Sequence, residues 1–218
     1  MAANETEEWR RSPARDFWGG IGPGDHVVQI YDDEQSFLSL LEGFVIGGFD
    51  ANACVVVIAT EEHLLALENR LRFQGHNLFE LKLQNQYVPL SARDTLSEFM
   101  INNWPDEMLF RHVMNRHIAK ARTMQRNVRA FGEMVTLLWS GGHSGATVQL
   151  ENLWNKICQI EGLSLFCSYP RTVFNQSALE AILDICGSQS KMIKLSNDSN
   201  HEILYKEIQY KGNKQEAL

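Results

Sequence analysis

The chain has 218 residues, of which 44% are hydrophobic and 22% are charged, and its formal net charge is -7 at pH 7. This length and hydrophobic content suit one domain with a single core, and the acidic balance argues against nucleic acid as a direct partner. No apolar run approaches the roughly 18 residues of a membrane span, and the polar N-terminus lacks the apolar segment of a secretory signal. We therefore expect a cytoplasmic protein with no membrane partner.

The first elements follow a polar segment. Residues 1–18 are predicted to form an N-terminal arm, and the glycine-rich stretch at 19–24 is unsuited to a helix or a central strand. Residues 26–31 (HVVQIY) are the first predicted strand. Apolar residues then recur at the spacing of one helix face from Ser36 to Gly47, which predicts a helix ended by Gly47-Gly48.

A continuous β-branched run at 54–59 (CVVVIA) is typical of a strand buried on both faces of a parallel sheet. Thr60 is expected to cap the next helix, which Gly75 would end. Residues 87–90 predict a short third strand. Ser91 is expected to start a helix that carries Leu96, Phe99 and Met100.

A helix is expected to restart at Pro105, since proline is tolerated in a first turn. Residues 128–134 and 163–169 are the fourth and fifth predicted strands, separated by helical segments through Trp139 and Ile157. The remaining predictions are a helix at about 176–186, edge strands at Ile193 and 203–205, and a disordered tail at 211–218.

Alternating strands and helices predict a three-layer α/β domain over residues 19–210 with a mostly parallel central sheet. Ligand sites in such sheets gather at the carboxyl ends of the strands. We therefore select side chains that follow or end the predicted strands, together with one tryptophan from the helical segment after the fourth strand. The candidate ligand-binding residues are Tyr31, Asp32, Asp33, Glu61, Glu133, Trp139 and Tyr169.

Several segments in combination resemble a known family: residues 26–49 (HVVQIYDDEQSFLSLLEGFVIGGF), 128–142 (VRAFGEMVTLLWSGG) and 150–170 (LENLWNKICQIEGLSLFCSYP), with a weaker likeness at 99–110. The chain resembles the MEDS domain, the sensory domain of methanogen and methylotroph regulators typified by DcmR. The resemblance implies an intracellular input domain of a prokaryotic regulator, related to RecA- and KaiC-type ATPase folds. No kinase core or helix-turn-helix is visible, so we expect a standalone module.

The related ATPase folds carry a phosphate-binding loop after the first strand. Such a loop needs the pattern G-x-x-x-x-G-K-[ST], in which glycines expose backbone N–H groups and a lysine neutralises phosphate. The segment Tyr31–Ser36 has no glycine and no lysine, and instead holds three carboxylates that would repel a phosphate. The resemblance therefore predicts a RecA/KaiC-like fold without its P-loop. Thr60-Glu61-Glu62 resembles the paired acidic residues at the end of the second strand of a KaiC-like domain.

Each candidate residue has a structural alternative. Glu133 either contacts a polar ligand or caps the helix that follows it, and Asp32 and Asp33 either line an acidic cleft or cap the helix that begins near Gln35. Trp139 packs in the core or forms the wall of a pocket, and Tyr169 at its strand end is open to either role.

No spacing of histidine and cysteine indicates a zinc site, and we expect no metal and no cofactor. The four cysteines, Cys54, Cys158, Cys167 and Cys186, are interpreted as small apolar residues in a reducing compartment. Basic residues between Arg111 and Arg126 indicate either a solvated helix face or a docking face for an acidic partner.

The sequence thus predicts a non-enzymatic sensory module. A small ligand or a partner protein would bind at the carboxyl edge of the sheet and shift a homodimer or partner interface. The alternative is a degenerate ATPase-like enzyme or nucleotide-binding protein that uses Glu61, Glu62 and Glu133. A structural oligomeric scaffold is a third interpretation.

Overall fold

A computed structural model of the chain describes residues 9–173, 190–196 and 201–208. These residues contain an eight-stranded sheet in the order β1-β10-β9-β2-β8-β7-β3-β4. Neighbouring strands from β9 to β4 are parallel, whereas β10 pairs antiparallel with both β9 and β1. The strands are β1 (Arg10–Pro13), β2 (His26–Tyr31), β3 (Cys54–Ala59), β4 (Tyr87–Ser91), β7 (Val128–Gly132), β8 (Ser164–Pro170), β9 (Ser190–Leu195) and β10 (Glu202–Glu207).

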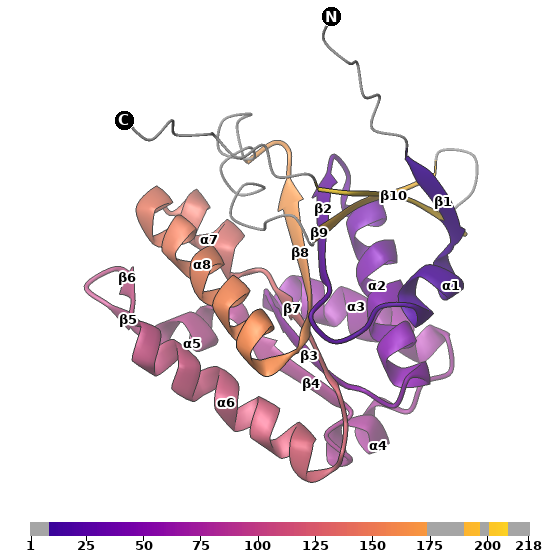
Figure 1. Cartoon of the computed structure of the whole chain (residues 1–218), viewed down its shortest axis with the longest axis horizontal. Coiled ribbons are helices and arrows are strands. Elements are labelled where there is room, and N and C mark those ends of the chain that lie inside the picture. Colours follow the sequence, from indigo (N-terminus) through magenta and orange to yellow (C-terminus); the bar gives the residue numbers. More distant parts are fainter. Residues whose placement is uncertain (1–8, 174–189, 197–200, 209–218) are drawn as a thin grey trace, which may run out of the picture.

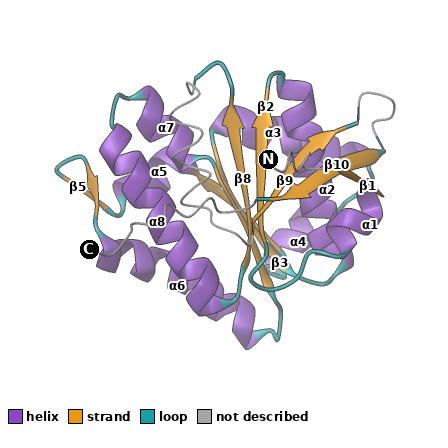
Figure 2. Cartoon of the chain, turned by 45° about the horizontal axis from the view of Figure 1, so that its top comes forward, coloured by secondary structure: helices purple, strands orange, loops and turns teal. Residues whose placement is uncertain are grey.

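Helices cover both faces of this sheet and give it three layers (Figures 1 and 2). One face packs against α1 to α4 and the other against α5 to α8. A two-stranded hairpin of β5 (Met100–Ile101) and β6 (Trp104–Pro105) lies apart from the sheet. The helices are α1 (Ala14–Gly19), α2 (Glu34–Asp50), α3 (Glu61–Phe73), α4 (Leu78–Leu83), α5 (Ala92–Ser97), α6 (Glu107–Thr123), α7 (Met134–Ser140) and α8 (Ser144–Glu161).

Strand alternation divides the apolar residues into two cores. Along β2, Val27 belongs to the core under α1 to α4 and Val28 to the core under α5 to α8, because successive side chains point to opposite faces. The six residues of β3 are all buried, as a central strand covered on both faces requires. No helix among the described residues is long and apolar enough to cross a membrane.

The predicted α/β class with a mostly parallel sheet is confirmed. The strands expected near Ile193 and 203–205 are β9 and β10, but they are not edge strands, because β10 pairs with β1 and β9 pairs with β2. The predicted helix at 176–186, Cys186 and the tail at 211–218 lie outside the described residues. Cys54, Cys158 and Cys167 are buried and unbridged.

Three further local predictions were wrong. Residues 10–19 form β1 and α1 instead of a polar arm, because Phe17 and Trp18 are buried and β1 pairs with β10. The helix expected to carry Phe99 and Met100 ends at Ser97, since the chain turns into the β5–β6 hairpin. Accordingly, Pro105 closes β6, and Asp106 caps α6.

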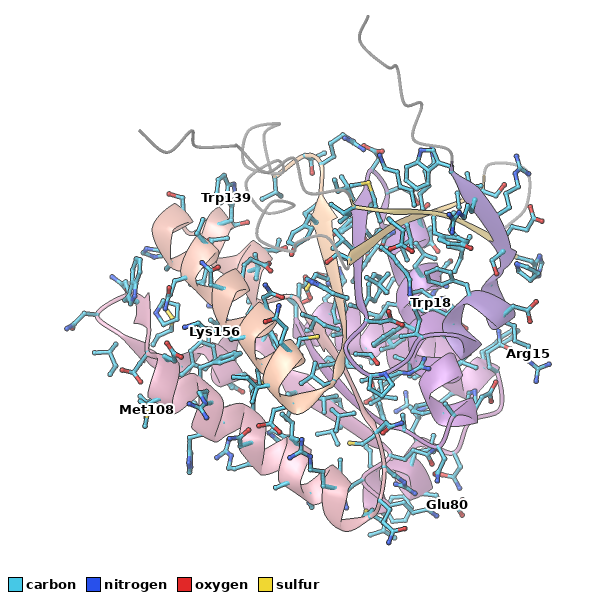
Figure 3. All side chains as sticks on the ribbon, in the orientation of Figure 1. Arg15, Trp18, Glu80, Met108, Trp139 and Lys156 are labelled. Carbon is cyan, nitrogen blue, oxygen red and sulfur yellow. The ribbon has the colours of Figure 1, made fainter. Side chains whose placement is uncertain are left out.

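The third error concerns the glycines of α2, which do not end the helix. Added β-carbons at Gly43 and Gly47 would lie 2.5 Å from Trp18 Nε1 and 2.7 Å from Trp18 Cβ, and one at Gly48 would lie 2.4 Å from Val55 Cγ2. The glycines therefore let α2 approach α1 and β3 closely. Trp18, labelled in Figure 3, is 1% exposed in this contact.

We predict that Gly47→Ala destabilises the protein by about 1–3 kcal/mol, because overpacking outweighs the roughly 1 kcal/mol that alanine contributes to a helix. Denaturant unfolding of both proteins would measure the difference. Gly22→Ala is the matched control, since an added β-carbon there meets nothing within 4 Å. Equal or greater stability of Gly47→Ala would contradict the packing argument.

Candidate functional site

The carboxylate of Glu133 connects two neighbouring strand ends at the carboxyl edge of the sheet. Glu133 follows β7, and its backbone N–H donates to the carbonyl of Ile58 in β3. Its Oε2 accepts a hydrogen bond from the backbone N–H of Thr60 at 2.9 Å, and its Oε1 lies 2.8 Å from Nδ1 of His63. The expected alternative, in which Glu133 caps the helix after it, is wrong, because its side chain makes no capping bond to α7.

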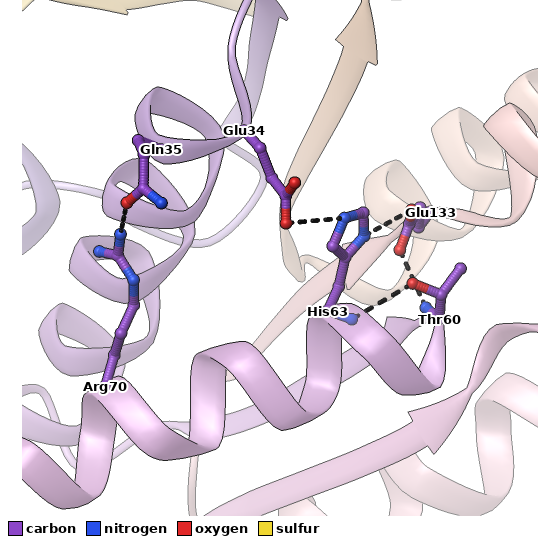
Figure 4. Close-up of polar contacts among 6 residues, drawn as sticks. All are labelled: Glu34, Gln35, Thr60, His63, Arg70 and Glu133. Carbon is purple, nitrogen blue, oxygen red and sulfur yellow. Dashed lines mark hydrogen bonds and ion pairs between the residues drawn. The ribbon is translucent and has the colours of Figure 1, made fainter.

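His63 lies between two carboxylates (Figure 4). It sits in the first turn of α3, where Thr60 accepts a hydrogen bond from its backbone N–H, as expected for an N-cap. The imidazole Nε2 is 3.9 Å from Oε1 of Glu34, opposite its contact with Glu133. Burial lowers the pKa of His63, but hydrogen bonding to Glu133 and the charges of Glu133, Glu34 and Glu62 outweigh burial and raise it above its ordinary value.

Aromatic rings connect His63 to the end of β2. Tyr31 stacks on Phe37 with ring centroids 4.9 Å apart, and the edge of Phe37 packs on His63 at 4.8 Å. The pKa of Tyr31 is raised by burial and by the charges of Glu133 and Glu34. Tyr31 therefore stays protonated at neutral pH within the field of both carboxylates.

Tyr31 also lines a cavity of about 430 Å³. Asp33 lines it and caps α2, accepting 2.8 Å and 2.6 Å hydrogen bonds from the backbone N–H and the hydroxyl of Ser36. The structural alternative for Asp33 is therefore confirmed. Asp32 also lines the cavity, and its Oδ1 accepts a 2.9 Å hydrogen bond from Nε of Arg171.

The paired glutamates after β3 make no hydrogen bond to the His63–Glu133 pair among the described contacts. Glu61 accepts a 2.8 Å hydrogen bond from the hydroxyl of Ser91 at the end of β4, which lowers the pKa of Glu61. Glu61 and Glu62 are both exposed. The charge of Glu62, and not that of Glu61, contributes to the raised pKa of His63.

Two further predicted site residues, Tyr169 and Trp139, also lie away from this cluster. Tyr169 is 1% exposed and faces the core under α5 to α8, where its hydroxyl donates a 2.5 Å hydrogen bond to Glu151 of α8. Trp139 is half-buried on α7 (Figure 3), and its indole N–H donates to the carbonyl of Val173 at 3.0 Å. The seven candidate residues therefore do not form one site: Tyr31, Asp32 and Asp33 line the cavity, and Glu133 lies beside it.

The sequence analysis did not select four of the residues that shape this region: Glu34, His63, Arg171 and Gln29. His63 could have been found from its place three residues after an N-cap that follows a buried strand. Arg171 could have been found because it directly follows the strand that neighbours β2. No group of three or more metal-ligating side chains is placed to hold a metal ion in the part of the chain that the structure describes.

Comparisons with known proteins place these features in a family. The MEDS family (MEthanogen/methylotroph, DcmR Sensory domain) matches residues 25–185. This chain belongs to the MEDS family. A sensory role in signalling is thus the role its family implies, and the resemblance drawn from the sequence is confirmed.

The MEDS chain is also similar in structure to the flagellar accessory protein FlaH from Methanocaldococcus jannaschii. The TM-score is 0.53 with 12% sequence identity, over 93% of this chain and 88% of that one. At this identity the likeness shows the fold alone, and it confirms the predicted RecA/KaiC-like architecture. No curated protein matches the sequence.

We predict that Glu133→Gln lowers the pKa of His63, because the negative charge that favours the protonated imidazole is lost while burial remains. Titration of the His63 ring protons by NMR would measure the change. Glu61→Gln is the control, since Glu61 is bonded to Ser91 and should leave the pKa unchanged. An unaltered titration of His63 in Glu133→Gln would show that Glu133 does not set its charge.

A second pH effect comes from Glu151. Burial raises its pKa from 4.5 to about 7, although the hydrogen bond from Tyr169 opposes the shift. Between these values the folded protein keeps a proton that the unfolded chain releases, so the free energy of unfolding falls as pH rises, by about 3 kcal/mol in full. Glu151→Gln removes this contribution to the pH dependence of the free energy of unfolding. We therefore expect the stability of the variant relative to the native protein to rise between pH 4.5 and 7.5, measured by denaturant unfolding. A pH-independent difference would refute the buried-acid assignment.

Proposed function

We propose that this MEDS domain is a sensory module that binds a small molecule in the cavity at the carboxyl end of β2 and performs no catalysis. The observation that carries the proposal is the cavity itself. Its volume of about 430 Å³ falls within the range of small-molecule sites, and it lies at the sheet edge where open α/β folds bind ligands.

The contacts around Tyr31 supply a route for the response. Tyr31 lines the cavity and stacks on Phe37, which packs against His63 at the start of α3. A ligand that moves Tyr31 would disturb the contacts of His63 with Glu133 and Glu34. Its output would be a change at the interface with a signalling partner or a second copy of the chain.

The alternative of a degenerate ATPase-like protein has less support. Both oxygens of Glu133 are hydrogen-bonded within the protein, and Glu61 is bonded to Ser91. A catalytic carboxylate needs a free oxygen within reach of the group that it activates. Asp33 occupies the N-terminal turn of α2, the position at which a P-loop protein holds phosphate.

Thermal melting distinguishes the small-molecule sensory module from the ATPase-like alternative. We expect no stabilisation by ATP with magnesium and a raised Tm with at least one pool of small polar metabolites, since a ligand at 100 times its Kd contributes about 2.7 kcal/mol. The increase should disappear in Gln29→Leu, which alters the cavity floor, and persist in Glu61→Gln. Clear stabilisation by ATP and magnesium would overturn the proposal in favour of nucleotide binding.

A further inference from the structure

The cavity at the end of β2 has a buried polar floor. Gln29 lines it and is 2% exposed. Its side-chain oxygen accepts a 3.0 Å hydrogen bond from the hydroxyl of Ser168 in β8. The amide nitrogen of Gln29 has no hydrogen-bond partner among the described residues. Because Gln29 lines the cavity, this amide can donate to an acceptor on a ligand.

Asp32 and Asp33, the two aspartates that line the cavity, both accept hydrogen bonds within the protein. Asp33 uses its two oxygens on Ser36, and hydrogen bonding to Ser36 lowers the pKa of Asp33 and keeps it charged. Asp32 pairs with Arg171 through Nε alone, at 2.9 Å. The two terminal nitrogens of Arg171 have no partner in the described part of the chain, and they present the planar fork that matches a carboxylate.

A second cation completes the lining. Lys194 of β9 lines the cavity, and its ammonium lies 4.5 Å from the ring centroid of Trp9, with no carboxylate partner among residues 9–173, 190–196 and 201–208. The first turn of α2 also borders the cavity, but its N-terminus is already capped by Asp33, so the positive charge open to a ligand comes from the two side chains. Apart from the second oxygen of Asp32, the groups left unpaired at this cavity are therefore donors and cations, although its aspartates and cations balance in formal charge.

We propose that the ligand of this cavity is a small molecule with a single carboxylate, held by Arg171 and Lys194 with a polar group against Gln29. This assignment rests on the proposed ligand-binding function and names the class of its ligand. A phosphate monoester, with nearly two negative charges, would face Asp32 and Asp33 against the same two cations. A simple amine would meet only carboxylates that already accept hydrogen bonds from Arg171 or Ser36.

The probe is a fragment panel in four series of matched shape: carboxylates, their primary amides, the corresponding amines and the corresponding phosphate monoesters. Binding is measured by ligand-observed NMR and by titration with the intact protein at low and moderate salt. We expect the carboxylates to bind at least tenfold more tightly than their partners in the other series. Arg171→Gln and Lys194→Gln should each weaken carboxylate binding about tenfold, whereas Arg93→Gln on the exposed surface of α5 should not.

Asp32→Asn gives the sharpest distinction between ligand classes. Removing this carboxylate frees the charge of Arg171, so carboxylate affinity should increase severalfold, whereas the affinity of an amine would decrease. Hits confined to amines, amides or phosphates and lost in Gln29→Leu would overturn the carboxylate class and leave the binding function standing. An absence of hits in all four series, together with no stabilisation by metabolite pools, would overturn both.

Discussion

The carboxyl edge of the sheet depends on how the Glu133 carboxylate is used. β3 and β7 are neighbours, so Thr60 and Glu133 leave the sheet side by side. The carboxylate of Glu133 accepts a hydrogen bond from the backbone N–H of Thr60 and contacts the imidazole of His63, three residues further along the chain. A carboxylate that is 6% exposed would be costly if it were left without donors. His63, Thr60 and the aromatic ring of Phe37 are consequently ordered around it, and α3 is fixed relative to β7.

The electrostatic character of the adjacent cavity shows why an acidic sequence segment need not make an acidic site. Asp32-Asp33-Glu34 contains three carboxylates in a row, yet each has a different role in the fold. Asp33 caps α2, Asp32 is neutralised by a residue from β8's end, and Glu34 faces His63 away from the cavity lining. What remains open to a ligand is set by the partners of these residues, and that explains why cations dominate the unpaired groups.

The sequence was most informative for features that depend on residues close together in the chain. The continuous apolar run of β3, the N-cap at Thr60 and the alternation of strands with helices depend on neighbours in the chain, and they predicted the fold class. The site depends on pairs that lie far apart: Thr60 and Glu133 are 73 residues apart, and Asp32 and Arg171 are 139 apart. The glycines of α2 were misread for the same reason, because their purpose is contact with Trp18 and Val55, which no local pattern reveals.

The partners of these carboxylates also bear on how a fold of this kind can hold an anion. Such a fold can hold phosphate on the free backbone N–H groups at the start of a helix that follows a strand. Here the protein's own carboxylates take two such positions: Asp33 binds the N–H of Ser36 in α2, and Glu133 binds the N–H of Thr60 before α3. An external anion at either place would compete with a tethered carboxylate and meet its charge. The ligand proposed for the cavity would therefore rely on side chains beyond these helix ends, and those that line the cavity at the end of β2 include Gln29, Arg171 and Lys194.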